Sequence, residues 1–322
     1  MRALLCKELG KPLVVEEVPA PPLSEGTVRV AMRAAGVNFA DLLLIEGKYQ
    51  EKPALPFSPG MEGAGTVVEV APGVSDVKPG TRVITLTGLG AAVSELVLPA
   101  SDVIATPDEM DDITAAGFPV SYGTAHLGLW HRARLKAGEV LLVHAAAGGV
   151  GLAAVEVGKA MGAVVIGSAG GAEKCALAKA HGADHVFDYR NEDIRERVKA
   201  LTDGRGADVI FDPVGGDVFD ASLRCINWEG RLLVVGFASG RIPQVPANIV
   251  LVKNIAVLSV YWGAYRKRNP ALYRESFAAL FEMYRKGRLR PEVSRTFKFS
   301  EANEAYRLLG SRQTTGKLVL IP

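Results

Sequence analysis

The sequence predicts an α/β protein in which a region of short strands precedes a doubly wound parallel sheet. Two observations support this fold class. Residues 1 to about 110 contain short apolar or alternating runs separated by Gly, Pro, Asp and Ser, a pattern typical of a small barrel or sandwich. From about Glu139, continuous apolar runs alternate with helical runs, which is typical of a parallel sheet covered by helices.

Composition narrows the class of protein. The chain has 322 residues, 48% hydrophobic and 22% charged, enough for one large or two ordinary domains. Its net charge of +2 gives no general attraction to nucleic acid or to anionic membranes. The apolar runs are too short to span a bilayer, and Glu8 comes too early for a signal-peptide core. Cys6, Cys175 and Cys225 are scattered and match neither a disulfide framework nor a metal-binding motif. We therefore expect the protein in the reducing cytoplasm.

The strands expected in the N-terminal region lie within "TVRVAMRAAGV", "GAGTVVEVAPGV", "GTRVITL" and "AAVSELVLPA". The sequence pattern then changes from that of strands to that of a helix. Pro107 and Asp108 are expected to open a helix with an acidic first turn.

The strands and helices expected next are "EVLLVHA", "VGLAAVEVGKAMG", "AVVIGSA", "AEKCALAKAHG", "DHVFDY", "NEDIRERVKALTD", "ADVIFDPV", "VFDASLRCI" and "GRLLVVGFA". "NIAVLSVYW" is expected to be a last strand. An amphipathic helix follows, with Leu272, Phe277, Leu280 and Phe281 on one side. "GKLVLIP" ends the chain as a strand, and we expect it to join the N-terminal region, with the α/β unit inserted between them.

A glycine-rich loop follows the first strand of the α/β region, in "VHAAAGGVGLAAVEVGKAMGA". Gly148 stands where backbone must approach a pyrophosphate closely, and Gly151 where the helix must pack tightly on the strand. Ala146 replaces the first glycine of the usual pattern, which is acceptable if its φ is not positive. Phosphates would bind at the helix N-terminus. The alternative is a tight turn with a purely structural role.

The end of the second strand indicates which dinucleotide would bind. An NAD site usually has an acid there, but residues 168–170 are Ser, Ala and Gly. Lys174 follows in the next helix, and Tyr189 and Arg190 close the third strand. A missing acid beside cations and a phenol favours a 2′-phosphate, hence NADPH. The alternative is that Lys174 and Arg190 are solvated surface charges.

Other polar residues lie in the N-terminal region. Asn38 and Asp41 would share one face of a helical turn, although Asp41 could simply cap a helix. Glu62 precedes a buried strand, so we expect its carboxylate to be paired. Tyr49 is either a surface phenol or a functional one. The five histidines form no metal pattern with cysteine, and His144 is expected to be a satisfied core residue.

Several motifs together resemble a known family. They are "GVNFADLLLIEGKY", "PFSPGMEGAGTVVEVAPGV", "GTRV", "HAAAGGVG", "DPVGGD", "EGRLLVVGFASG" and "GKLVL". In combination the chain resembles the NADPH:quinone oxidoreductases, the zinc-free, zeta-crystallin-like branch of the medium-chain dehydrogenases/reductases. The resemblance implies a discontinuous GroES-like β-barrel domain at residues 1–121 and 262–322. It also implies an inserted Rossmann domain at 122–261 that binds NADP, an active site in the cleft between the domains, and a homodimer.

Two departures from the zinc-dependent relatives bear on the chemistry that the resemblance implies. Those enzymes carry Cys where this chain has Asn38 and His where it has Met61, and they often have a four-cysteine zinc lobe that is missing here. No metal is therefore expected. Without a Lewis acid, hydride transfer to a conjugated acceptor is easier than oxidation of an alcohol.

The resemblance also implies roles for particular residues of this chain. The expected cofactor contacts are Thr124, Gly148, Gly149, Val150, Ser168, Lys174, Tyr189, Gly236, Phe237 and Lys317. The expected substrate-cleft residues are Asn38, Asp41 and Tyr49.

The function expected from these features is zinc-independent, NADPH-dependent reduction of quinones or related α,β-unsaturated carbonyls by direct hydride transfer. The partner is then a small molecule, with no nucleic acid and no membrane. One alternative is an enoyl-thioester reductase, for which the basic run "YRKRN" at 265–269 could bind a CoA phosphate. Another is a non-catalytic NADPH-binding protein.

Overall fold

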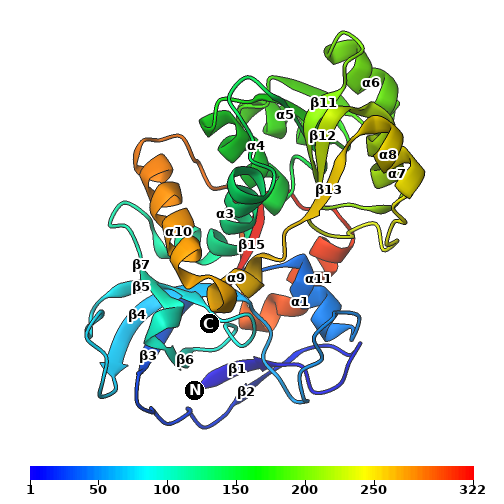
Figure 1. Cartoon of the computed structure of the whole chain (residues 1–322). Coiled ribbons are helices and arrows are strands. Elements are labelled where there is room, and N and C mark those ends of the chain that lie inside the picture. Colours follow the sequence, from blue (N-terminus) through cyan, green and yellow to red (C-terminus); the bar gives the residue numbers. More distant parts are fainter. The chain divides into compact units, whose positions relative to one another are not determined.

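A computed structural model describes all 322 residues, which form two compact units. Residues 1–120 and 291–322 form the first unit, and residues 121–290 form the second. Figure 1 labels the elements of both. No helix in the chain combines the length and the apolar character needed to cross a membrane.

Seven strands build the main sheet of the first unit. They are β3 (Thr27–Val37), β4 (Glu62–Val70), β5 (Arg82–Leu86), β6 (Glu95–Pro99), β7 (Val103–Ala105), β14 (Val293–Lys298) and β15 (Lys317–Ile321). Their order is β14-β15-β3-β4-β5-β7, and β6 also pairs with β3. β15 lies antiparallel to β3, with Leu318 opposite Val37. The last strand of the chain therefore completes a sheet whose other strands come mostly from the first 105 residues.

The rest of the first unit consists of a strand pair and short helices. They are β1 (Arg2–Leu5), β2 (Val14–Glu17), α1 (Phe39–Ile45), η1 (Ala100–Asp102), α2 (Asp112–Gly117), η3 (Phe299–Glu301) and α11 (Ala302–Gly310). α2 begins later than the sequence predicted at Pro107 and Asp108. The reason is the cap: the Asp111 carboxylate accepts the backbone N–H of Thr114 at 2.8 Å.

A six-stranded parallel sheet forms the centre of the second unit. Its strands are β8 (Val140–Val143), β9 (Val164–Ala169), β10 (His185–Asp188), β11 (Ala207–Asp212), β12 (Ile226–Val234) and β13 (Ala256–Ser259). The order β10-β9-β8-β11-β12-β13 is that of a doubly wound fold, with the strand order reversing between β8 and β11. All four residues of β8 are buried, as expected for a central parallel strand. The fold class predicted from the α/β rhythm is confirmed.

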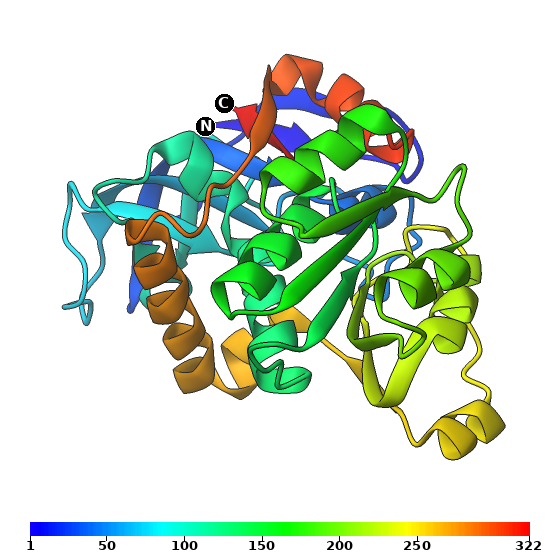
Figure 2. The same ribbon diagram turned by 90° about the horizontal axis from the view of Figure 1, so that it is seen from above.

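Helices connect and flank these strands. They are α3 (Pro119–His126), the π-helical turn η2 (Leu127–Arg132), α4 (Gly149–Ala160), α5 (Ala172–Ala180), α6 (Ile194–Leu201), α7 (Gly216–Cys225), α8 (Ala247–Lys253), α9 (Trp262–Arg268) and α10 (Pro270–Arg285). Figure 2 shows α8, in yellow to gold, projecting from the rest of the second unit. Leu251 and Val252 on this helix are 79% and 66% exposed.

Residues 262–290 belong to the second unit, whereas we expected them in the first domain. Side-chain packing explains the difference. A Cβ at Gly123 would lie 2.4 Å from the indole nitrogen of Trp262, so α9 rests directly on α3. Ser276 of α10 lies 2.8 Å from Nδ1 of His126, which is also in α3. The amphipathic face of α10 is thus buried against the start of the second unit.

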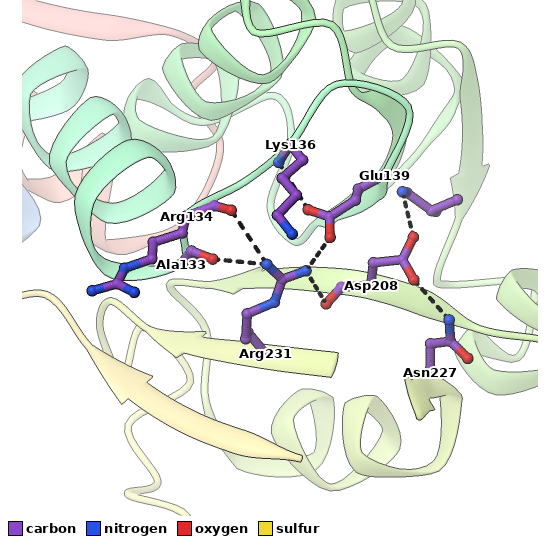
Figure 3. Close-up of polar contacts among 8 residues, drawn as sticks. Ala133, Arg134, Lys136, Glu139, Asp208, Asn227 and Arg231 are labelled. Carbon is purple, nitrogen blue, oxygen red and sulfur yellow. Dashed lines mark hydrogen bonds and ion pairs between the residues drawn. The ribbon is translucent and has the colours of Figure 1, made fainter. Parts of the chain in front are cut away.

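An ion-pair network closes the amino-terminal end of the parallel sheet (Figure 3). The guanidinium of Arg231 donates to the carbonyl oxygen of Ala133 at 2.9 Å and to the carboxylate of Glu139 at 2.6 Å. The Asp208 carboxylate accepts the Val140 N–H at 2.8 Å and the Asn227 amide at 2.7 Å. These bonds connect the starts of β8, β11 and β12.

Candidate functional site

The glycine loop lies at the carboxyl end of β8, where the strand order reverses. Gly148 is the N-cap of α4 and has extended backbone angles, φ −83° and ψ 168°. No side chain caps this 12-residue helix, so its first N–H groups point to the loop without a side-chain partner. A helix N-terminus at the switch point of a doubly wound sheet is where such folds bind phosphate groups.

Two features of the loop explain its sequence. A Cβ at Gly151 would lie 2.1 Å from the carbonyl oxygen of Ala145, so only glycine fits there, as the sequence predicted. Ala146, in the position of the missing first glycine, does not have a positive φ. The positive φ falls instead on Ala145, at 50°. The substitution by alanine is therefore compatible with the turn.

A cationic cluster stands beyond the end of β9. A Cβ at Gly170 would lie 2.7 Å from the hydroxyl of Tyr189 and 3.0 Å from Nε of Arg190, so both side chains close over this glycine. Burial lowers the pKa of Lys174, and the charge of Arg190 lowers it further. Two cations thus lie close enough to repel each other at a strand end that carries no acid. An anion placed there would relieve that repulsion.

Arg190 is a member of this cluster that the resemblance did not assign. The signal for it was present in the sequence, since Arg190 directly follows Tyr189 at the end of the third strand. What the sequence could not show is that its guanidinium would lie against Gly170 and Gly171.

Ser168, expected near the 2′-phosphate, lies in the interior of the second unit. It is 1% exposed, and its hydroxyl lies 2.8 Å from Nδ1 of His144. The other ring nitrogen of His144 lies 2.8 Å from the hydroxyl of Ser222. Burial lowers the pKa of His144, so the ring is held neutral between two serines. The prediction that His144 is a satisfied core histidine is confirmed, and Ser168 is one of its partners.

The remaining expected cofactor residues of the second unit lie on two elements. Gly236 and Phe237 follow β12 at its carboxyl end. The Phe237 ring packs against Gly215, whose added Cβ would be 3.0 Å away. Thr124 lies within α3 and is 8% exposed.

A buried polar cluster occupies the first unit. Lys317 at the start of β15 donates to Oε1 of Glu62 at 2.6 Å and to Oδ1 of Asn38 at 2.5 Å. Asn38 donates its amide N–H to the same Glu62 oxygen at 2.9 Å. The pairing expected for Glu62 is thereby confirmed. Lys317, which we expected to contact the cofactor, has its ammonium group buried beside Glu62, because a buried carboxylate needs a cation.

Asp41 lies in the first turn of α1 and is fully buried. Its carboxylate accepts the backbone N–H of Asn38 at 2.8 Å and that of Gly60 at 3.2 Å, so the capping role is present. Burial raises its pKa to about 7, although these bonds and the charge of Lys317 act in the opposite direction. The charge of Asp41 in turn adds to the effect of burial in raising the pKa of Tyr306.

Tyr49 is the third residue expected near a substrate. Its ring is partly buried and packs against the apolar cluster that contains Leu44 and Tyr306.

Comparison with known proteins places the chain in a family. Residues 24–108 match the model of the alcohol dehydrogenase GroES-like domain, and residues 149–281 match that of the zinc-binding dehydrogenases. The chain is 47% identical to a quinone oxidoreductase-like protein 2 homolog from Nematostella vectensis, over 99% of this chain and 88% of that protein. The chain belongs to the quinone oxidoreductase family. The resemblance deduced from the motifs is confirmed.

Two other members of the family are similar over their whole length. The chain is 34% identical to a 2-haloacrylate reductase of a Burkholderia species, covering 100% of this chain and 99% of that protein. The crystal structure of Escherichia coli quinone oxidoreductase complexed with NADPH matches with a TM-score of 0.92 at 32% identity, covering all of both chains.

The domain family raises the question of zinc. The residues in this chain do not fit that ion. Asn38 and Met61 offer an amide and a thioether where zinc favours thiolate and imidazole. The one carboxylate of the set, Glu62, already carries an ammonium group 2.6 Å from Oε1, and its second oxygen accepts the Val120 N–H at 2.7 Å. A cation would have to displace Lys317 to reach it.

Proposed function

We propose that this protein is an NADPH-dependent reductase of quinones and related α,β-unsaturated carbonyl compounds, acting by direct hydride transfer without zinc. The observation that carries the proposal is the pairing of an uncapped α4 N-terminus at the switch point with the Lys174–Tyr189–Arg190 cluster one strand away. The names of the relatives point to the same chemistry, since they include quinone oxidoreductases and a 2-haloacrylate reductase.

Different residues of this chain would bind different parts of the cofactor. The backbone of Gly148, Gly149 and Val150 would hold the pyrophosphate, and Lys174, Tyr189 and Arg190 would hold the 2′-phosphate. Thr124, Gly236 and Phe237 would hold the nicotinamide, which supplies the hydride when the cofactor is bound.

The protein itself supplies orientation and electrostatics. In the first unit Asn38 and Asp41 are the residues proposed to line the substrate site, with Tyr49 nearby. Quinones and enones delocalise the negative charge that arrives with a hydride, so no metal is needed to stabilise it.

A panel of acceptors tests the proposal. We expect purified protein to oxidise NADPH with ortho- or para-quinones or with simple enones, with full activity in chelator and negligible oxidation of alcohols. Activity with enoyl-CoA thioesters but not with quinones would move the function to the enoyl-thioester alternative. NADPH binding without turnover of any acceptor would leave only a non-catalytic binding protein.

We also propose that the protein is a homodimer. β13 is an edge strand of the parallel sheet, and the segment that precedes it in the sequence exposes apolar side chains, including Ile242 at 71% and Leu251 at 79%. Edge strands and apolar patches of this kind usually have a partner. Light scattering should give about twice the chain mass of 34.1 kDa.

We further propose a cytoplasmic location. All three cysteines are unpaired thiols, and Cys6 and Cys225 are buried. Thiols stay unpaired in a reducing compartment. Fractionation of the source cells tests this.

A further inference from the structure

Three side chains in the first unit form a closed triangle of hydrogen bonds. Lys317 comes from β15, Glu62 from the start of β4, and Asn38 from the residue before α1. The three distances are 2.6 Å from Lys317 to Glu62, 2.5 Å from Lys317 to Asn38 and 2.9 Å from Asn38 to Glu62. Asn38 is 7% exposed, Glu62 is fully buried and Lys317 is 6% exposed.

The surrounding backbone is shaped to contain this triangle. A Cβ at Gly36 would lie 2.5 Å from Oε1 of Glu62, and one at Gly117 would lie 2.8 Å from Cγ of Lys317. Neither glycine has a positive φ, so neither is required for the conformation of its own backbone. Both are required to leave room for the Glu62 and Lys317 side chains.

The triangle fixes the orientation of the Asn38 amide. Its oxygen faces an ammonium group and one of its N–H groups faces a carboxylate. The flipped amide would put the NH₂ group against the ammonium and the oxygen against the carboxylate, and both contacts would be repulsive. The backbone of Asn38 is fixed as well, because its N–H donates to Asp41 at 2.8 Å.

One donor of this amide is left over. The NH₂ group has two hydrogens, and one of them is bonded to Glu62. The ammonium on the amide oxygen withdraws electron density from the group, which makes the remaining N–H a stronger donor.

We propose that Lys317 and Glu62 are positioning residues that orient and polarise the Asn38 amide, whose second N–H donates to the carbonyl oxygen of the acceptor. The proposal rests on the proposed reductase function. A hydride that adds to the conjugated carbonyl brings two electrons and one hydrogen, and an electron pair moves onto the carbonyl oxygen. Asn38 stabilises that oxygen by a hydrogen bond and transfers no proton. Water later protonates the oxygen to complete the reduction.

The test uses the intact protein with NADPH and acceptors of graded electron affinity. Lys317→Met with Glu62→Gln removes both charges together, so that no unpaired charge remains buried. We expect kcat to fall by about 100-fold, the lower end of the effect of losing one donor to a developing oxyanion. The NADPH dissociation constant should stay unchanged. The loss should be larger for a simple enone than for a benzoquinone, because the enone anion depends more on the donor.

Two further variants separate positioning from a merely structural role. Asn38→Ala alone keeps the Lys317–Glu62 ion pair and should show a similar loss of kcat. The triple variant should lose no more than Asn38→Ala does, because the two charged residues act through the amide. The control is Lys7→Met with Glu16→Gln, an exposed pair 2.5 Å apart, which should keep wild-type kcat.

The possible negative results contradict different parts of the proposal. Wild-type kcat in Asn38→Ala would overturn the inference even if the double variant does not fold. A fully additive triple variant, or an equal loss for every acceptor, would also overturn it. A wild-type protein that reduces no acceptor would instead refute the proposed function on which the inference rests.

Discussion

Two arginines at opposite ends of the same parallel sheet are used in opposite ways. Arg231, at the amino end, donates to Ala133, to Glu139 and, at 3.3 Å, to Arg134 (Figure 3). Arg190, at the carboxyl end, donates no hydrogen bond from its guanidinium to any protein acceptor. It lies instead beside a second cation, Lys174.

The polar residues at the amino end of the sheet contribute to stability, whereas those at the carboxyl end are suited to binding a ligand. At the amino end the Arg231 guanidinium is bonded to a carboxylate and to backbone carbonyls, and the Asp208 carboxylate to two N–H donors, so the network connects strands. At the carboxyl end two cations lie close together, which costs stability and would be relieved by an anionic ligand. Substitutions at the amino end should therefore change the free energy of unfolding, and substitutions at the carboxyl end should change the affinity for NADPH.

The largest effect is expected at the amino end. Arg231→Met removes the partner of Glu139, whose side chain is only 22% exposed, and leaves backbone carbonyls unbonded. We expect the free energy of unfolding to fall by about 2–4 kcal/mol, measured by urea denaturation. Once folded, the variant should bind NADPH with wild-type affinity.

A matched control is available for that variant. Arg197→Met breaks an ion pair with Glu192 whose members are 43% and 38% exposed, and it should cost at most about 1 kcal/mol. If Arg231→Met weakened NADPH binding but left stability unchanged, the division between the two ends would be wrong.

The next effect concerns the carboxyl end. Lys174→Ala should weaken NADPH binding by about 10- to 100-fold, and Arg190→Ala by about 10-fold, because each loses a charge-assisted bond to phosphate. NADH affinity should hardly change, since that cofactor lacks the 2′-phosphate. Titration by fluorescence measures both. The exposed Arg205→Ala is the control, and equal losses for NADPH and NADH would refute the cofactor assignment.

A smaller effect depends on pH. The folded protein keeps His144 neutral because its pKa is lowered, while in the unfolded chain it titrates near about 6.5. The unfolded state therefore takes up the proton first, and this contribution to stability is lost as the pH falls below that value. The loss is at most about 1.4 kcal/mol per pH unit.

Other buried groups titrate in the same range, so the comparison needs a variant. Burial lowers the pKa of His126 to about 4, which has the same sign as His144, whereas Asp41 has a raised pKa and the opposite sign. The difference in unfolding free energy between wild type and His144→Gln isolates one group. If that difference did not change between pH 7.5 and 5.5, the buried neutral histidine would be excluded.

The smallest effect is expected for Tyr189→Phe. The Tyr189 side chain is 44% exposed and contributes one neutral hydroxyl near Arg190. We expect about a threefold weaker affinity for NADPH and no change for NADH. A loss as large as that of Lys174→Ala would mean that the phenol, and not the lysine, is the main phosphate contact.

The local features of the second unit were predictable from the sequence. The strand–helix alternation gave the doubly wound sheet, because buried parallel strands and amphipathic helices have different apolar periods. Gly151 was assigned correctly, since close packing of a helix start on a strand tolerates no side chain. His144 was also interpreted correctly, because a histidine within an apolar run must be bonded internally. Each of these inferences depends on neighbours within a few residues.

What the sequence left open depends on residues far apart along the chain. A buried partner was expected for Glu62, but nothing near it in the sequence indicates Lys317, because β15 pairs with β3 across the whole inserted unit. Ser168 turned inward because His144 and Ser222 meet it in the sheet interior. Residues 262–290 joined the second unit because Trp262 and Ser276 pack on α3. The elements and the glycine loop follow from local chemistry that can be recognised in the sequence, whereas the contacts between buried charges depend on strands that pair across the whole fold.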